Sequence, residues 1–316
     1  MRVLVTGGAG FIGSHVADAL LAAGHEVVVV DDLSSGNPRN LPAAARFERV
    51  DIVDASALER VFAAFRPEVV THQGAQTSVA VSAREPVRDA TTNVVGSIRV
   101  LECCVRHRVD RLVFASTGGA IYGEVPDPRK AKVGDVTVPL SPYACSKLSV
   151  EHYLAAWKAE HGLHSTVLRY SNVYGPRQDP HGEAGVVAIF SRRILRGEPL
   201  QINAMRTQGD HGCIRDYVAV ADVVAANLAA VAGELGDCTI NICTGVATTT
   251  LDIAEGLMAA LGTRVELRPG PRRAGDLERS VLDETEMRAR VGGPLALAEG
   301  LAATAAWFRA HADRSD

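Results

Sequence analysis

The chain has 316 residues, enough to bury a large core, and its length alone allows about two domains. Hydrophobic residues make up 47% of the chain and charged residues 22%, which is the composition of a globular protein. The net charge of -4 and the lack of a long basic run argue against nucleic acid or an anionic membrane surface as the main partner.

The first residues of the chain and the spacing of its cysteines indicate where the protein is located and whether it binds a metal. A strand is expected from Arg2, with no charged and apolar leader before it, and the apolar run 27–30 is far too short to span a bilayer. The six cysteines form no Cys-x-x-Cys pair and no zinc-like spacing with histidine. We therefore expect a cytoplasmic protein with buried free thiols and no metal site.

Apolar strand runs alternate with helical patterns through the first half of the chain. Strands are expected at 3–5, 27–30, 47–50, 69–71, 112–115 and 166–169, and helices at 11–23, 55–65, 86–107 and 143–161. Near-continuous apolar strands separated by helices indicate a parallel sheet with helices on both faces. The predicted fold class is α/β, a Rossmann-type doubly wound parallel sheet.

The pattern loosens after Arg169. A helix is expected at 183–196, short strands near Leu200 and at 213–217, and a strand at 238–242 that returns to the main sheet. The run 265–267 and the alanine-rich tail from Pro294 are expected to be peripheral. We therefore expect two interleaved α/β domains, a first formed by residues 1–170 and about 212–245, and a smaller one formed by about 171–211 and 246–316.

A glycine-rich turn, Gly7-Gly8-Ala9-Gly10-Phe11-Ile12-Gly13, follows the first expected strand and opens a helix. Its backbone N–H groups can approach a pyrophosphate at the positive end of that helix. The next strand ends in Asp31, and an acid about 20 residues after the turn can bind a ribose while repelling a 2′-phosphate. NAD is therefore expected rather than NADP, the alternative being that Asp31 and Asp32 simply end a strand.

Two further polar residues can face the same cofactor. Asp51 ends the third expected strand, at a position that can meet adenine. Asn93 lies among apolar neighbours in a helical run, so its amide needs a partner, either the cofactor or the backbone.

Tyr143 and Lys147 stand four residues apart at the start of an expected helix. This spacing puts both side chains on one helical face, where an ammonium beside a phenol favours the ionised phenol. A free tyrosine, with a pKa of about 10, is a poor base at neutral pH. Beside a lysine and a positively charged nicotinamide it becomes a usable base for hydride chemistry. The alternative is an ordinary helix surface, and the glycine-rich opening favours the catalytic interpretation.

With these residues the chain resembles the extended short-chain dehydrogenase/reductase family, and within it the UDP-glucose (UDP-galactose) 4-epimerases. The likeness spans nearly the whole chain. Its further motifs are His72 to Gln76, Asn93, Phe114 to Thr117, Ile121 to Gly123, Leu168 to Arg177, Arg215 to Tyr217 and Arg273 to Leu277.

The resemblance implies that the first domain binds NAD and the smaller one binds the nucleotide sugar. It also implies a set of site residues and no metal. Tyr143 would be the base, Lys147 would bind the nicotinamide ribose, and Thr117 would contact the sugar O4, with Ser116 as second candidate. The implied cofactor contacts are Gly7, Gly10, Phe11, Ile12, Gly13, Asp31, Asp32, Ser35, Gly36, Asp51, Ile52, Gln73, Gly74, Ala75, Gln76, Asn93, Ser116, Tyr143, Lys147 and Tyr170.

The implied substrate contacts are Thr117, Tyr143, Asn172, Val186, Val187, Arg215, Arg273 and Asp276. The two arginines would bind the diphosphate, because the guanidinium fork can bond phosphate oxygens in pairs. Asp276 would contact the uridine ribose. Each arginine taken alone is more often a solvated surface charge.

Three departures from the family pattern refine the expectation. Gly118 and Gly119 stand where related 4,6-dehydratases carry an Asp-Glu pair, and glycines cannot move a proton, so epimerisation is favoured over dehydration. The segment 200–204 lacks the aromatic that usually stacks on uracil, which leaves the base open. Ser280 stands where epimerases restricted to simple hexoses are bulky, which suggests room for an N-acetyl group.

The expected function is NAD-dependent inversion at C4 of a UDP-hexose through a transient 4-keto sugar. UDP-glucose and UDP-galactose are the expected substrates, with N-acetylhexosamines as additional candidates. The alternatives are a UDP-glucuronate 4-epimerase or another nucleotide-sugar epimerase, and a regulator that binds NAD without catalysis. The resemblance also implies a homodimer, formed by the helices expected at 86–107 and 143–161.

Overall fold

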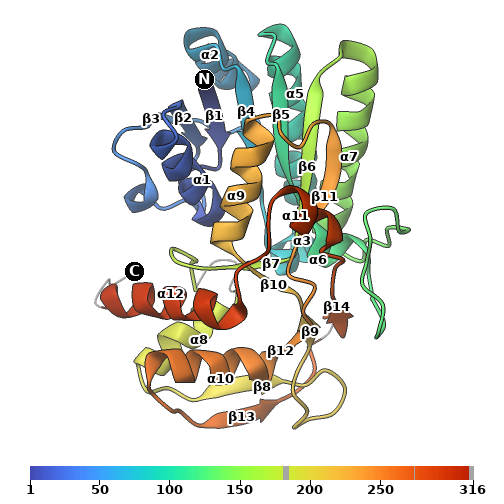
Figure 1. Ribbon diagram of the computed structural model, residues 1–316. Coiled ribbons are helices and arrows are strands. Elements are labelled where there is room, and N and C mark those ends of the chain that lie inside the picture. Colours follow the sequence, from blue (N-terminus) through green and yellow to red (C-terminus); the bar gives the residue numbers. More distant parts are fainter. Residues whose placement is uncertain (181–184, 274, 313–316) are drawn as a thin grey trace. The chain divides into compact units, whose positions relative to one another are not determined.

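Seven strands form the central sheet, in the order β11-β6-β5-β4-β1-β2-β3 (Figure 1). They are β1 (Arg2–Thr6), β2 (Glu26–Asp31), β3 (Arg46–Arg49), β4 (Val69–His72), β5 (Arg111–Thr117), β6 (His164–Tyr170) and β11 (Cys238–Ile242). The pairs from β3 to β5 are parallel. The predicted parallel sheet is confirmed, and the strand expected at 238–242 is one edge of it.

The computed structural model describes residues 1–180, 185–273 and 275–312. It divides into two units. Unit 1 comprises Met1–Ile121, Val138–Arg169 and Val223–Ile240, and unit 2 comprises Tyr122–Thr137, Tyr170–Asp222 and Asn241–Asp316. The assignment of one domain to the cofactor and another to the nucleotide sugar stays a prediction.

Helices accompany the sheet of unit 1. They are α1 (Phe11–Ala22), α2 (Ala55–Phe65), α3 (Val79–Arg84), α4 (Pro86–Ala90), α5 (Gly96–Arg106), α6 (Gly118–Ile121), α7 (Pro142–His161) and α9 (Val220–Val231), with a short 3-10 helix, η1 (Pro38–Asn40). In Figure 1, α1 and α9 lie on one side of the sheet, and α2, α5 and α7 pack in a row. The pattern between 86 and 107 predicts one helix, and the structure keeps it helical but with a π-helical turn, η2 (Thr91–Val95).

The core of unit 1 follows from the periodicity of its elements. On α2, Leu58, Val61, Phe62 and Phe65 recur at helical spacing and are buried in one cluster with Phe114 of β5. Burying a side chain of this size stabilises the fold by about 1.5–3 kcal/mol. Asp54 begins α2 by accepting a hydrogen bond from the Ala57 N–H, which satisfies one of the donors at the helix start.

The order of strands across the sheet switches at β1. The chain runs from β1 to β2 and β3 on one side, and then continues through β4 and β5 on the other. Loops at such a switch point, beyond the carboxyl ends of the strands, are the usual ligand site of an open α/β sheet. The glycine-rich turn after β1 and the loop after β4 meet there, because Gly74 N donates to Thr6 Oγ1 at 3.1 Å.

Buried polar contacts cross this point. His72 of β4 is 2% exposed and lies between two hydroxyls, Thr6 Oγ1 at 2.6 Å from Nδ1 and Ser97 Oγ at 2.9 Å from Nε2. Ser97 in turn donates to the carbonyl of Asn93. Burial, together with the positive charge of Lys147, lowers the pKa of His72 to about 3, so the imidazole is neutral.

Unit 2 contains three small sheets. β7 (Asn172–Tyr174) pairs with β10 (Tyr217–Ala219), β8 (Leu200–Asn203) pairs with β13 (Leu267–Gly270), and β9 (Ile214–Arg215) lies between β12 (Thr248–Thr249) and β14 (Arg279–Ser280). Its helices are α8 (Val186–Leu195), α10 (Thr250–Leu261), α11 (Thr285–Arg290) and α12 (Leu297–Ala310). The start of the helix expected at 183–196 lies outside the described residues.

The prediction of a peripheral C-terminal tail is wrong. Leu301 and Ala305 of α12 are 1% exposed and belong to the same buried cluster as residues of α8 and α10. Small residues at helical spacing allow this close packing, and alanine alone carries too weak a hydrophobic signal to reveal it. The run at 265–267 likewise leads into β13, which pairs with β8 along its whole length.

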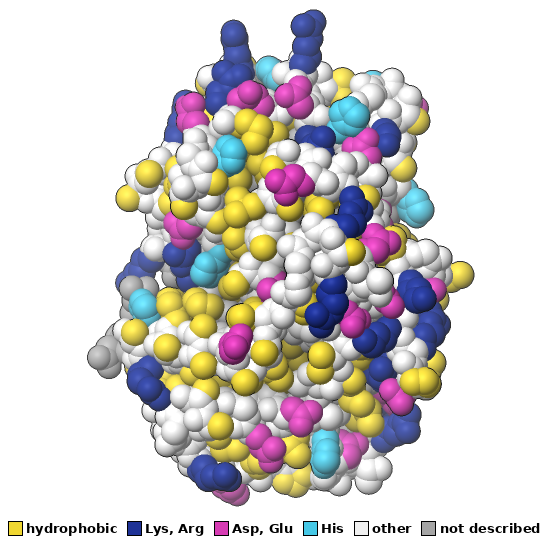
Figure 2. Space-filling view, viewed as in Figure 1, with side chains coloured by type: hydrophobic (Ala, Val, Ile, Leu, Met, Phe, Trp, Pro, Cys, Tyr) yellow, Lys and Arg dark blue, Asp and Glu magenta, His cyan; other side chains and the backbone are white. Residues whose placement is uncertain are grey.

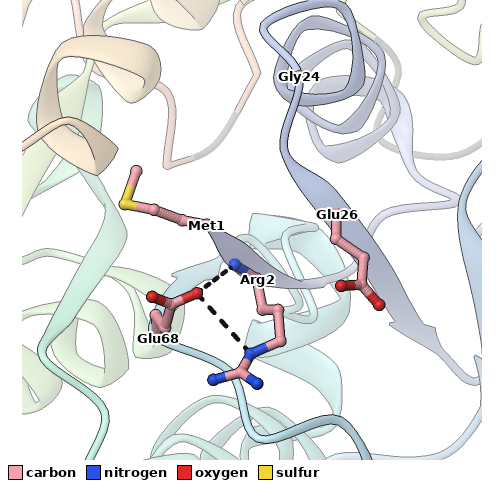
Figure 3. A pocket seen from close by; sticks show the side chains of 5 residues that line it. All are labelled: Met1, Arg2, Gly24, Glu26 and Glu68. Atoms are coloured by element: carbon pink, nitrogen blue, oxygen red, sulfur yellow. Dashed lines mark hydrogen bonds and ion pairs between the residues drawn. The ribbon is translucent and has the colours of Figure 1, made fainter.

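The surface shown in Figure 2 carries Lys and Arg side chains interspersed with Asp and Glu. No described helix is long and apolar enough to cross a membrane. A hollow of about 440 Å³ is lined by Met1, Arg2, Gly24, Glu26 and Glu68 (Figure 3). It lies where β1 and β2 begin, at the opposite end of these strands from the glycine-rich turn, and it contains no predicted site residue.

Gly13→Ala should destabilise the protein by about 1–3 kcal/mol or more, because a Cβ there would lie 2.1 Å from the Gly7 carbonyl oxygen. Gly134→Ala is the matched control, since its Cβ would meet nothing within 4 Å. Urea denaturation measures both. Equal midpoints for the two variants would contradict the prediction.

Stability should fall as the pH drops from 6.5 toward 3, because His72 binds a proton when unfolded but not when folded. The loss due to His72 between pH 7 and pH 5 should be about 2 kcal/mol, and His72→Gln should reduce the slope. Urea denaturation at several pH values measures it. His25→Gln serves for comparison, because the pKa of His25 is also lowered but its ring is only partly buried, so this substitution should change the slope less. An unchanged slope in His72→Gln would refute the assignment.

Candidate active site

The glycine-rich turn forms a backbone cradle after β1. Gly7 has a φ of +67°, and a Cβ on it would lie 2.6 Å from the backbone of Gly74, so the two loops approach more closely than a side chain permits. Helix α1 begins at Phe11, and its N-cap, Gly10, makes no side-chain capping bond. Glycine has no side chain that could cap the first N–H groups of the helix. These groups therefore suit an anion such as a pyrophosphate.

Asp31 lies at the end of β2 beside this turn. It is 8% exposed, and its carboxylate accepts hydrogen bonds from the N–H groups of Ala9 at 3.0 Å and Leu33 at 2.9 Å. Burial raises the pKa of Asp31, and the two N–H bonds act in the opposite direction. A Cβ on Gly36 would come within 2.7 Å of this carboxylate, so the loop after β2 folds tightly over it.

The predicted cofactor contacts nearest this loop differ in how deeply they are buried. Asp32 accepts from the N–H and hydroxyl of Ser34, whereas Ser35 and Asp51 are exposed. Ile52 is 7% exposed and its side chain packs in the core, so its backbone is the part available to a ligand. The glycine cradle and the buried acid at the end of β2 together fit a dinucleotide with a free ribose 2′-hydroxyl.

The loop after β4 is held by Asn93. The Asn93 amide oxygen accepts from Gln76 N at 2.8 Å, and its nitrogen donates to Gln76 O at 2.8 Å and to Asp89 Oδ1 at 3.0 Å. Of the two partners left open by the sequence, the structure shows the backbone. Gln73 donates to Thr71 and Asn227, and Ala75 lies half-buried between these two anchored glutamines.

Helix α7 carries Tyr143 in its first turn. Ser141 caps the helix by accepting from Ala144 N, and Pro142 occupies the first turn, where a missing N–H costs little. Tyr143 is half-buried, whereas Lys147, one turn later, is 4% exposed. Lys147 Nζ donates to the Ala115 carbonyl at 3.0 Å and lies 5.0 Å from the centre of the Phe114 ring. The ammonium is thus held against β5 in the interior of unit 1.

The two hydroxyl candidates at the end of β5 differ in their surroundings. Ser116 donates to Glu151 Oε1 at 2.5 Å, and Glu151 also forms a buried ion pair with Arg169, at 2.6 Å between Oε2 and a terminal guanidinium nitrogen. Thr117 is 8% exposed and leads directly into α6. The Ser116 hydroxyl therefore already donates to a carboxylate of the protein.

Tyr170, the remaining predicted cofactor contact, is 6% exposed at the end of β6. Glu151 and Arg169 are absent from the residues that the sequence predicts for the site. The recurrence of polar residues at 143, 147 and 151 on one face of a helix is the signal that could have revealed Glu151.

Several predicted substrate contacts lie in unit 2. Asn172 is exposed at the start of β7, and Arg215 is half-buried in β9. Burial raises the pKa of the Cys213 thiol, the charge of Arg215 opposes this shift and the charge of Asp276 adds to it.

Arg273 has a partner that the sequence did not suggest. With the Asn203 amide turned so that its oxygen faces Arg273, that oxygen accepts from Arg273 Nε at 2.7 Å and from a terminal nitrogen at 3.0 Å. Val187 is 1% exposed in the core of unit 2, and Val186 is partly buried against it, so their side chains contribute mainly to packing.

Ser280 is 2% exposed in β14, where its backbone pairs with that of Arg215. This register places the residue proposed to set sugar size directly beside a predicted diphosphate ligand. The structure thus brings Ser280 to the same small sheet as Arg215, although the two are far apart in sequence.

Comparisons with known proteins identify the family of the chain. The family model described as "NAD dependent epimerase/dehydratase family" matches residues 3–243. A UDP-glucose 4-epimerase of Mycolicibacterium smegmatis is 45% identical over 316 residues, covering 98% of this chain and 99% of that protein.

Solved structures extend the agreement to three dimensions. The UDP-glucose 4-epimerase of Thermus thermophilus in complex with NAD matches with a TM-score of 0.94 at 49% identity, over 98% of this chain and 99% of that one. The enzyme of Thermotoga maritima with UDP-glucose matches with a TM-score of 0.92 at 47% identity, over the same shares of the two chains. The predicted family is confirmed, and the chain belongs to the NAD dependent epimerase/dehydratase family.

Proposed function

We propose that the protein is an NAD-dependent 4-epimerase that interconverts UDP-glucose and UDP-galactose. The observation that carries this proposal is the buried Lys147, held by the Ala115 carbonyl one helical turn after Tyr143. Burying a charged lysine in the interior costs free energy unless the ammonium is paired or hydrogen-bonded, so a lysine kept there points to a functional task. Beside a tyrosine at the carboxyl end of β5, that task is to favour the phenolate.

The residues divide the chemistry among them. When bound, NAD would supply a reversible acceptor for the hydride at C4 of the sugar. Tyr143 removes the proton from O4 as the sugar is oxidised and gives it back as the sugar is reduced. Thr117 donates a hydrogen bond that orients O4. The glycines at 118 and 119 offer no acid or base for loss of water, so the reaction ends in epimerisation.

The cofactor would be held by the residues at the switch point. The N–H groups of Gly10 to Gly13 would bind the pyrophosphate, and Asp31 with Asp32 would bind the adenosine ribose. The predicted remainder of this set is Gly7, Ser35, Gly36, Asp51, Ile52, Gln73 to Gln76, Asn93, Ser116, Lys147 and Tyr170.

For the nucleotide sugar we propose Arg215 and Arg273 as diphosphate ligands, Asp276 as a ribose contact and Asn172 as a further contact. The Asn203 amide supports this role for Arg273, because it holds the guanidinium in one plane while leaving donors on its other edge. The small side chain of Ser280 supports UDP-N-acetylhexosamines as further substrates. Val186 and Val187 would contribute their backbone.

We also propose a homodimer and a cytoplasmic location. Val87 and Val95, at the start of the 86–107 helical run, are 79% and 41% exposed, and Tyr153 of α7 is 38% exposed. Large exposed apolar side chains on these two neighbouring helical runs suit burial against a second copy.

The free cysteines, buried or partly buried apart from Cys145, suit a reducing compartment and so support the cytoplasmic location.

Tyr143→Phe should lower the rate of epimerisation by about 100-fold or more, because it removes the proton acceptor and leaves the fold intact. Proton NMR of mixtures containing protein, NAD and UDP-galactose measures conversion at C4, and a separate titration measures NAD affinity, which should change little. Turnover near the wild-type rate in this variant would refute the proposed mechanism.

The same NMR measurement, with UDP-glucose, UDP-GlcNAc, UDP-GalNAc and UDP-glucuronate, tests the substrate range. Conversion without net reduction of NAD supports an epimerase, and the preferred sugar identifies the substrate. Absence of conversion with every one of these nucleotide sugars would overturn the proposal.

Thr117→Val and Ser116→Ala form a matched pair on adjacent residues. Thr117→Val should lower kcat by about 10- to 100-fold with little change in stability, because it removes one hydrogen bond to the reacting oxygen. Ser116→Ala should mainly lower stability, because its hydroxyl donates to Glu151. Kinetics with UDP-galactose and thermal melting separate the two effects. The reverse pattern would make Ser116 the O4 contact.

A further inference from the structure

Asp89 is a buried carboxylate that the function above does not use. It lies on α4, is 0% exposed, and its oxygens accept hydrogen bonds from three side chains. Oδ1 accepts from Gln76 Nε2 at 2.8 Å and from Asn93 Nδ2 at 3.0 Å, and Oδ2 accepts from Ser146 Oγ at 2.6 Å. All three donors are uncharged side chains, and their hydrogen bonds offset part of the cost of burying this carboxylate.

The three donors belong to segments that are distant in sequence. Gln76 closes the loop after β4, where its amide also bonds to Ser78 N at 2.6 Å and to Ser78 O at 3.1 Å. Ser146 lies on α7 directly before Lys147, whose ammonium is held by Ala115. A single carboxylate therefore joins the loop after β4 to the helical turn that contains Tyr143 and Lys147.

The bond to Asn93 makes this junction rigid. Asn93 uses both ends of its amide on the backbone of Gln76, and the same amide nitrogen reaches Asp89. Asp89 and Asn93 stand four residues apart where the helical run enters a π-helical turn, so both side chains lie on one face and contact Gln76. Each member of the group has its partners inside unit 1.

We propose that Asp89 is a positioning residue that fixes the loop after β4 relative to the Tyr143–Lys147 turn of α7. This inference rests on the proposed function in one respect, namely that both segments bind NAD. The consequence is a preorganised site: the protein holds the two segments in place before the cofactor arrives, so binding does not have to order them.

The geometry requires acceptors at Asp89 and does not require its charge. In Asp89→Asn the amide oxygen can accept from Gln76 and Asn93, and its NH2 can donate to Ser146 Oγ, since a hydroxyl also accepts. In Asp89→Leu, a side chain of similar size, all three donors lose the acceptor that joins them. The asparagine variant is therefore the conservative rescue, and the leucine variant is the disruption.

The experiment measures NAD affinity, kcat with UDP-galactose, and amide hydrogen exchange of residues 73–78 in both variants. Asp89→Leu should weaken NAD binding about tenfold or more, lower kcat, and accelerate exchange in that loop. Asp89→Asn should stay within about threefold of the wild type in affinity. Thr166→Val is a control for general destabilisation, because it removes a buried hydrogen bond to Gly236 O near the amino end of β6; it should lower the melting temperature without changing NAD affinity.

The outcomes that overturn the proposal are specific. Native NAD affinity and native exchange in Asp89→Leu would show that the junction is not needed, and equal damage in Asp89→Asn would show that charge, not acceptor geometry, matters. If Asp89→Leu does not fold, Ser146→Ala tests the same junction, with native affinity and exchange again counting against it. A wild type that binds NAD but converts no UDP-sugar would refute the proposed function, and the affinity and exchange results would still decide the role of Asp89.

Discussion

The packing of α7 against the carboxyl end of β5 is the constraint on which the candidate site depends. Lys147 donates to Ala115, and Glu151 accepts from the next residue, Ser116, so successive turns of the helix are tied to successive residues of the strand. Arg169 of β6 completes this arrangement by pairing with Glu151 at two oxygens. Removing one partner of such a buried pair costs about 3–5 kcal/mol, which makes the helix position well defined.

That position sets the geometry of the proposed catalytic pair, Tyr143 and Lys147. The helix fixes their spacing, and the strand fixes the depth of the ammonium. His72, which lies close enough for the charge of Lys147 to lower its pKa, stays neutral. The imidazole therefore adds no second positive charge beside Lys147, and the charge of Arg169 is paired with Glu151.

A comparable buried centre organises unit 2. Asp216 is 1% exposed and accepts from the N–H groups of Thr244, Gly245 and Leu282 and from the Thr244 hydroxyl. Burial raises the pKa of Asp216, and these hydrogen bonds oppose the shift. Because Asp216 directly follows Arg215, the loops it binds together also fix the direction of the strand that carries the predicted diphosphate ligand.

The two buried centres also differ from the carboxylate at Asp89 in a useful way. Glu151 has an arginine as its partner, and Asp216 is held mainly by backbone N–H groups, whereas the donors on Asp89 are uncharged side chains. Glu151 joins α7 to β5 and β6, and Asp216 joins loops of unit 2, whereas Asp89 joins α7 to the loop after β4. This is why Asp89, of the three, is the one expected to couple two binding loops.

The sequence by itself determined the sheet, the glycine-rich turn, the acid at Asp31 and the Tyr143–Lys147 pair, because each depends on residues close together in the chain and on a short period. Tertiary structure decided which hydroxyl at the end of β5 is bonded to the protein, which partner Asn93 takes, and whether the alanine-rich tail is buried. Those outcomes depend on Glu151, Gln76 and α8, which lie far away in sequence. No local pattern records such contacts, because they form only when distant segments pack together.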